Sequence, residues 1–175
     1  MKPPITPTPS CTAADKQAYA AKYFKHEYGP ERRSVGMALK TGLYVKEVVN
    51  LIAHNTTSLR SYVGAILREH MEDYSALHGY FRRRLYNQVE PGDASIFEPA
   101  MEKYVDIFLN PANRVDAGMW ISVDKDIVKA MASLVKWLDN GSTVVSFATA
   151  ILDHHFAKYG AMLKEMKTET YLAQP

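Results

Sequence analysis

TVVSFATAILDHHFAKY, residues Thr143 to Tyr159, decides the fold, because the chain contains this stretch twice. Its counterpart SLRSYVGAILREHMEDY, Ser58 to Tyr74, begins 85 positions earlier (143 − 58 = 85), and eight positions of the two windows are identical or similar. In both copies the apolar residues and one histidine recur at i, i+3, i+4 and i+7, the spacing of one buried face of an α-helix. The two windows therefore predict two equivalent long helices.

Shorter matches upstream of the windows extend the repeat. Lys103-Tyr104 matches Lys22-Tyr23 and Gly118-Met119 matches Gly36-Met37, so the offset between the copies drifts from 81 to 85. Apolar residues alternate around both glycines, which is typical of a short strand. The elements expected in the first copy are a helix from Asp15 to about Tyr28, a strand from Arg32 to Leu39, a helix from Thr41 to about His54, and the long helix, which begins at Thr57 or Ser58 and can continue to Tyr86.

The second copy repeats this order. Its expected elements are a helix from Phe97 to Leu109, a strand from Val115 to Val123, a helix to Leu138 capped by Ser122 or Asp124, and the long helix from Thr143. Four prolines with Thr and Ser near the start leave too few apolar groups to fold. The chain is thus expected to divide into a disordered tail (1–13), a first helix-strand-helix-helix repeat (14–86), a connector (87–96) and a second repeat (97–170).

One strand in each repeat creates a pairing requirement. A lone strand leaves its backbone N–H and C=O groups unsatisfied, so it needs a partner strand. Pairing the two strands antiparallel places both helix pairs on one face of a ribbon, which is the ribbon-helix-helix arrangement. The predicted fold is therefore mostly α with a short two-stranded antiparallel ribbon, formed by tandem ribbon-helix-helix repeats as a pseudo-dimer within one chain. Pairing between two chains is the alternative.

The residues from Tyr104 onward also carry a recognisable pattern. It consists of Tyr104-x-x-x-Phe108-Leu109, Arg114, Met119-Trp120-Ile121-Ser122, and Ile151-Leu152-Asp153-His154-His155-Phe156 with Tyr159. This pattern resembles a domain of unknown function encoded in conjugative transposons of Bacteroidetes, over about residues 104–167 and more weakly over 19–81. The resemblance implies a ribbon-helix-helix-like, DNA-binding accessory protein linked to transposon transfer or mobilisation.

The candidate site residues follow from the ribbon. Strand alternation turns one set of side chains toward a DNA major groove, and Arg or Lys at the strand ends and free amides at helix N-termini suit phosphates. The expected groove-facing residues are Ser34, Gly36, Ala38, Gly118, Trp120 and Ser122, a set without the Arg, Lys, Asn or Gln that best discriminate bases. The expected phosphate contacts are Arg32, Arg33, Lys40, Arg114 and Lys125, with the helix starts at Ser58 and Thr143 and the nearby Arg60.

Charge and composition narrow the partners. The net charge is +2, but residues 1–86 carry 13 basic and 7 acidic side chains and residues 87–175 carry 8 and 12. The first half suits an acidic partner such as nucleic acid, or alternatively the two halves attract each other. The only cysteine, Cys11, excludes a disulfide framework or a cysteine-built metal site. No apolar run is long enough for a membrane span and no secretory signal is present, so a cytoplasmic location is the default expectation.

No pattern for catalysis is present in the sequence. It contains no nucleophile elbow, no glycine-rich phosphate loop and no paired carboxylates, and His155 lies in the apolar stripe as a structural histidine rather than a metal ligand. We expect no cofactor and no metal. The predicted function is a non-catalytic DNA-binding accessory or regulatory protein of a conjugative or mobilisable element. The alternative is a protein-interaction or scaffold module of the transfer apparatus, with itself or transfer proteins as partners.

Overall fold

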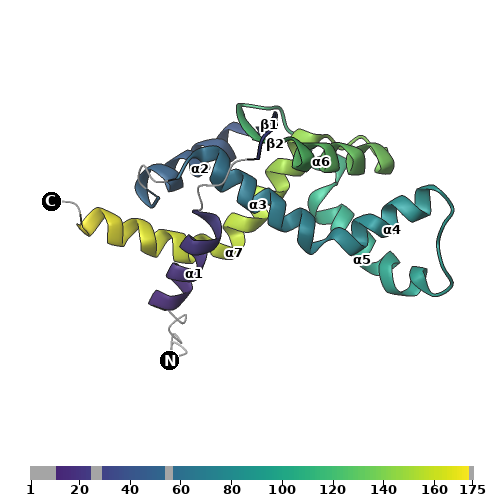
Figure 1. The fold of residues 1–175 in the computed structure, drawn as a ribbon, viewed down its shortest axis with the longest axis horizontal. Helices are drawn as coiled ribbons and strands as arrows, with labels where there is room; N and C mark the ends of the chain where they lie inside the picture. The colour runs from purple at the N-terminus through teal and green to yellow at the C-terminus, as the bar shows by residue number, and fades with distance from the viewer. Residues whose placement is uncertain (1–10, 25–28, 54–56, 174–175) are drawn as a thin grey trace, which may run out of the picture.

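In the computed structural model, which describes residues 11–24, 29–53 and 57–173, the chain is mostly helical with a two-stranded antiparallel sheet, as predicted. Residues 1–10 of the predicted tail, and the predicted helix ends at Tyr28 and His54, lie outside the described residues. The elements, coloured in chain order in Figure 1, are α1 (Ala13–Tyr23), β1 (Arg32–Met37), α2 (Leu39–Leu51), α3 (Leu59–Asp73), α4 (Ser75–Leu85), α5 (Asp93–Phe108), the 3-10 turn η1 (Pro111–Asn113), β2 (Met119–Asp124), α6 (Lys125–Leu138) and α7 (Val144–Ala173).

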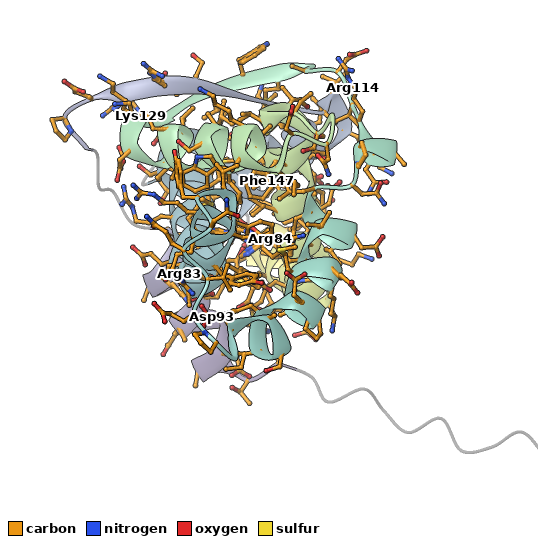
Figure 2. The ribbon with its side chains drawn as sticks, turned by 90° about the vertical axis from the view of Figure 1, so that its right-hand side faces the viewer. Arg83, Arg84, Asp93, Arg114, Lys129 and Phe147 are labelled. Carbon is orange, nitrogen blue, oxygen red and sulfur yellow. The ribbon has the colours of Figure 1, made fainter. Side chains whose placement is uncertain are left out.

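The two strands pair with each other within the one chain. Their register sets Val35 opposite Ile121, with Arg32 opposite Asp124 at one end and Met37 opposite Met119 at the other. Alternation turns Val35 and Ile121 toward the helices, and both side chains are buried. Figure 2 shows the ribbon along one edge of the molecule with the helices on one side of it. The ribbon thus has one face packed on the core and a second face turned away from the helices.

The helices beneath the ribbon cross from one half of the chain to the other. α7 packs against β1, and α3 packs against β2, so each long helix lies under the strand of the other half. α3 and α7 also pack against each other, with Tyr62, Leu67, Phe147 and Leu152 fully buried. The buried apolar side chains form one continuous core. Neither half therefore buries its apolar face without the other.

A set of aromatic contacts occurs twice in this core, with every residue shifted by 85. His155 Nε2 lies 2.9 Å from the Tyr19 hydroxyl, and His70 Nε2 lies 2.7 Å from the Tyr104 hydroxyl (155 − 70 and 104 − 19 both give 85). The ring of Tyr23 meets His155 edge-on at 4.7 Å between centroids, and the ring of Phe108 meets His70 edge-on at 4.5 Å. The hydrogen-bonding histidine belongs in each case to the long helix of the opposite half.

These contacts correct the alignment expected upstream of the long helices. Tyr104 takes the place of Tyr19, not of Tyr23, so the offset is 85 at the first helix and does not begin at 81. The two strands begin at Arg32 and Met119, 87 positions apart, and the helices that follow them begin at Leu39 and Lys125, 86 apart, so Gly118-Met119 does not take the place of Gly36-Met37. The sequence match failed here because identities of two adjacent residues are frequent by chance. The equivalent side-chain contacts in the core are the better guide to the alignment of the two halves.

Several element boundaries differ from the expected ones. α1 begins at Ala13 rather than Asp15, because Thr12 caps the helix and Asp15 bonds back to the Thr12 backbone, a capping box. β2 begins at Met119 rather than Val115, since the chain that would have to pair with residues 115–118 already turns into α2 at Leu39. α5 begins at Asp93, earlier than the expected Phe97.

The two long helices also end differently. In the first half the helix breaks at Tyr74, whose backbone leaves the helical region (φ −102, ψ 14), and α4 follows. In the second half α7 runs unbroken for 30 residues. Figure 1 shows α4 and α5 extending together on one side of the molecule and the end of α7 extending on the other. No helix in the described part of the chain is long and apolar enough to cross a membrane.

Candidate nucleic-acid interface

The outward face of the ribbon presents four of the predicted groove-facing residues in two opposed pairs. Ser34 stands opposite Ser122, and Gly36 stands opposite Trp120. Ser34 is exposed, Ser122 is half-buried, and the Trp120 side chain is 62% exposed, which is unusual for a tryptophan. The predicted inside-outside alternation therefore holds for β2, whereas in β1 Arg33 is exposed on the inner side and Gly36 is buried on the outer side.

Gly36 is buried and does not present its backbone for base contacts, contrary to the prediction. A Cβ on Gly36 would lie 2.9 Å from the Ala117 Cβ, 3.1 Å from a Val145 methyl group and 3.2 Å from the Trp120 indole. The segment before β2, the first turn of α7 and the indole thus enclose this position. Gly36 is needed for close packing, and Trp120 covers it.

Gly118 also differs from its predicted role. It lies before β2, although its N–H still donates to the Met37 carbonyl at 2.9 Å. A Cβ on Gly118 would lie 2.5 Å from the Leu39 Cβ and 2.9 Å from the Leu39 backbone. Gly118 therefore permits the chain to pass directly against the start of α2, which is a packing role.

A groove beside the ribbon gathers three predicted site residues. It lies between α3 and the end of β2, has a volume of about 500 Å³, and includes Arg32, Arg60 and Ser122 in its lining. We name it the first groove. Arg32 and Arg60 are half-buried there. Arg68 joins them and was missed from the sequence, although the four-residue spacing of Arg60, Gly64 and Arg68 along one helix face was the available signal.

Acidic side chains offset the cations of the first groove. The Arg68 guanidinium donates to Asp124 at 2.6 Å and to Asp126 at 3.3 Å, and Lys22 forms an ion pair with Glu69. Burial raises the pKa of the Glu69 carboxyl, but hydrogen bonds from Lys22 and Tyr23 outweigh it and the pKa is lowered. The charged residues that line the groove are Lys22, Arg32, Arg60 and Arg68 with Glu69, Glu72, Asp73 and Asp124. Basic and acidic groups are thus equal in number.

Asp124 was predicted as a possible cap of α6 and instead bonds away from that helix. It occupies the N-cap position, but its carboxylate accepts from the Gly29 N–H at 2.9 Å and from Arg68. Lys125, a predicted phosphate contact, donates to Glu31 at 2.9 Å. This ion pair leaves Lys125 less suited to a phosphate than expected, because Glu31 already neutralises it.

Three other predicted phosphate contacts are more accessible. Arg33, Lys40 and Arg114 are exposed and form no ion pair with the described residues. Arg33 lies near the start of β1, Lys40 in the first turn of α2, and Arg114 before β2. Figure 2 labels Arg114 near one end of the ribbon. Lys40 and Arg114 thus lie beyond the ends of the strands, whereas strand alternation places Arg33 on the same side of β1 as Val35.

The starts of α3 and α7 offer fewer free amides than predicted. Ser58 caps α3 and its hydroxyl accepts from the Ser61 N–H at 3.2 Å. Thr143 likewise accepts from the Ser146 N–H at 3.1 Å, and the Ser146 hydroxyl accepts from the Thr143 N–H at 3.0 Å. Each cap thus satisfies amide groups internally. These N–H groups at the starts of α3 and α7 are therefore not available to bind a phosphate.

A second groove, of about 520 Å³, lies at the other end of the ribbon between Arg114 and α7. Seven of its lining residues lie 85 positions after residues of the first groove, so the two grooves are equivalent places in the two halves. Their chemistry differs, because Arg68 and Glu69 are replaced by Asp153 and His154. The equivalent pairs are Lys22 and Ile107, Gly29 and Arg114, Ser61 and Ser146, Gly64 and Thr149, Ala65 and Ala150, Arg68 and Asp153, and Glu69 and His154.

The buried histidines lie inside the core, away from both grooves. His155 is 8% exposed and bonds Tyr19, as a structural histidine should. His70 and His78 share the Tyr104 hydroxyl, at 2.7 and 2.8 Å. Burial lowers the pKa of His70 and His155 to about 3 and that of His78 to about 4, so all three are neutral near pH 7. Among the described residues, no group of three His, Cys, Asp or Glu side chains is arranged to hold a metal ion.

The chain matches no model of a known protein family, no curated protein and no solved structure.

Proposed function

We propose that this chain is a DNA-binding accessory or regulatory protein of a conjugative or mobilisable element, acting without catalysis. The observation that supports it most is the ribbon, whose two strands pair within one chain and whose helices lie on one side. Each strand is followed by two helices, and each second helix crosses beneath the strand of the other half. We interpret this arrangement as two ribbon-helix-helix repeats fused into a pseudo-dimer.

The shape of the outward face suits duplex DNA. A two-stranded ribbon has the dimensions to enter the major groove, where base pairs are distinguishable from one another. Ser34, Trp120 and Ser122 occupy the outward positions. Lys40 and Arg114 beyond the strand ends, with Arg33 on the opposite side of β1 from Ser34, are exposed cations without ion pairs to the described residues, and they supply contacts to phosphates.

The link to a mobile element rests on the resemblance of the residues from Tyr104 onward. That pattern includes Met119 to Ser122, which form part of the ribbon, and Ile151 to Phe156, which lie in α7. The proposal therefore assigns the resembling residues to the same surface and the core beneath it.

The test is a fluorescence anisotropy titration of labelled random-sequence duplex DNA at about 50 and about 200 mM salt. We expect affinity to fall steeply with salt, and the triple variant of Arg33, Lys40 and Arg114 to alanine to reduce the log-log slope by about three units. The matched control replaces three exposed lysines of α5 and α7, Lys103, Lys158 and Lys164, by alanine and should leave the slope nearly unchanged. No binding at the lower salt concentration would exclude the proposal.

An exposed apolar patch supports a second candidate, a protein-interaction module. Leu39 and Leu43 lie one turn apart on α2 and are 54% and 53% exposed, and Leu39 abuts Gly118 close to Trp120. Exposed apolar residues that adjoin one another mark contact surfaces more often than isolated ones do. This candidate predicts self-association that persists at high salt and is lost in Trp120→Ala, which sedimentation velocity measures.

A further inference from the structure

The ribbon has an internal two-fold arrangement whose centre is the pair Val35 and Ile121. These residues stand opposite each other and lie 86 positions apart. The first residues of the following helices, Leu39 and Lys125, are also 86 apart (125 − 39 = 86). The two halves of the outward face on either side of this pair therefore occupy equivalent places.

The two halves of the outward face differ in chemistry. On one side of the central pair stand Ser34 opposite Ser122, followed by Arg32 opposite Asp124, which makes a polar half. On the other side Trp120 lies over the buried Gly36, which makes an apolar half. The equivalent places thus carry serine in one half and tryptophan in the other.

The surroundings of the two halves differ in the same direction. The polar half adjoins the first groove, in which Arg32, Arg60 and Arg68 lie together with acidic side chains. The apolar half adjoins the second groove, which contains one arginine, Arg114. Figure 2 shows Arg114 near one end of the ribbon and Lys129, which lines a pocket together with Asp124, toward the other end. The two halves therefore differ both in their outward side chains and in the grooves beside them.

A ribbon made of two identical strands presents the same side chains twice and matches a DNA site that is itself two-fold symmetric. We infer that this chain recognises a non-palindromic duplex site, with one chain bound to each site. The inference rests on the proposed function. The Trp120 half contacts thymine C5-methyl groups, since these are the apolar features of the major groove, whereas the Ser34 and Ser122 half makes polar contacts to base edges.

The test is selection of binding sites from a random duplex library by the full-length chain, followed by sequencing. We expect one enriched motif without two-fold symmetry, with thymine enriched in one half only. Trp120→Ala should relax the preference in that half, and Ser34→Ala combined with Ser122→Ala should relax the other half. Replacing thymine by uracil in the thymine-rich half should weaken binding about fourfold for each contacted methyl group, and in the other half should have no effect.

The outcomes separate this inference from the proposed function. A palindromic motif, an enrichment without any motif, or a loss of preference in both halves with Trp120→Ala would overturn the inference while DNA binding itself stands. A stoichiometry of two chains for each selected duplex, measured by sedimentation equilibrium, would overturn it as well. Absence of any duplex binding would overturn the proposed function and the inference together.

Discussion

Acidification should unfold this protein through its buried histidines. His70, His78 and His155 are 8%, 9% and 8% exposed, and their ring nitrogens bond tyrosine hydroxyls inside the core. Their folded-state pKa values of about 3, 4 and 3 lie below the ordinary value of 6.5. Between these values the unfolded chain binds more protons than the folded one, so the free energy of unfolding falls as the pH falls.

The magnitude follows from the width of this pH window. At about pH 5 each histidine is mostly charged in the unfolded chain and mostly neutral in the folded one. Each histidine therefore lowers the free energy of unfolding by about 1.4 kcal/mol for each pH unit below 6.5. The loss is about 2 kcal/mol for each histidine between pH 7.5 and pH 5, and about 6 kcal/mol for all three. Since a domain of this size is stable by about 5–15 kcal/mol, a large part of its stability is lost.

Urea unfolding followed by far-ultraviolet circular dichroism at several pH values from about 7.5 to about 5 measures this loss. His154 and His155 provide a matched pair, because they are adjacent on α7 and only His155 is buried. His155→Gln should reduce the pH-dependent part by about 2 kcal/mol, whereas His154→Gln should leave it nearly unchanged. The comparison uses the change with pH, so a constant destabilisation by either substitution does not affect it.

Two results would refute the reasoning. A free energy of unfolding that changes by less than about 1 kcal/mol over this range would mean that the histidines are not held neutral in the core. An equal reduction of the pH dependence by both substitutions would mean that burial is not the cause.

Two further predictions concern packing. Tyr104→Phe should lower the free energy of unfolding by about 1–3 kcal/mol for each histidine nitrogen that loses its partner. Tyr86→Phe, on the exposed surface, is the neutral control, and urea unfolding measures both variants. Gly118→Ala should lower the free energy of unfolding by about 1–3 kcal/mol, because the added Cβ would meet Leu39. Gly64→Ala should raise it by about 0.5–1 kcal/mol, because Gly64 lies inside helix α3 and nothing lies within 4 Å of the added Cβ. Equal effects of the two glycine substitutions on the melting temperature would contradict this reading.

The long helices were predictable because burial imposes a period that the sequence displays. Tyr62, Ile66, Leu67 and His70 lie on the predicted face and are buried, and Ser58 caps the helix as expected. The strand alternation was predictable for the same reason, since Val35 and Ile121 face the core. Local patterns thus identified the faces of the elements that build the ribbon and its support.

The partners across the two halves were not predictable from local patterns. The bond of Tyr19 to His155 joins residues 136 positions apart, and no spacing rule connects them. The same holds for Lys125 with Glu31 and for Arg68 with Asp124, which change the charge of the candidate interface. The closure over Gly36 depends on the size of Trp120 on the opposing strand, so the register had to be known first.

The most direct measurement of the proposed interface uses Trp120 itself. The chain contains two tryptophans, so Trp137→Phe leaves Trp120 as the only indole fluorophore, placed on the outward face of the ribbon and 62% exposed. We expect duplex DNA at low salt to change its emission and to protect it from acrylamide quenching, with both effects reversed by salt. If labelled DNA binds while Trp120 remains as accessible to acrylamide as in the free protein, the ribbon is not the DNA-binding surface.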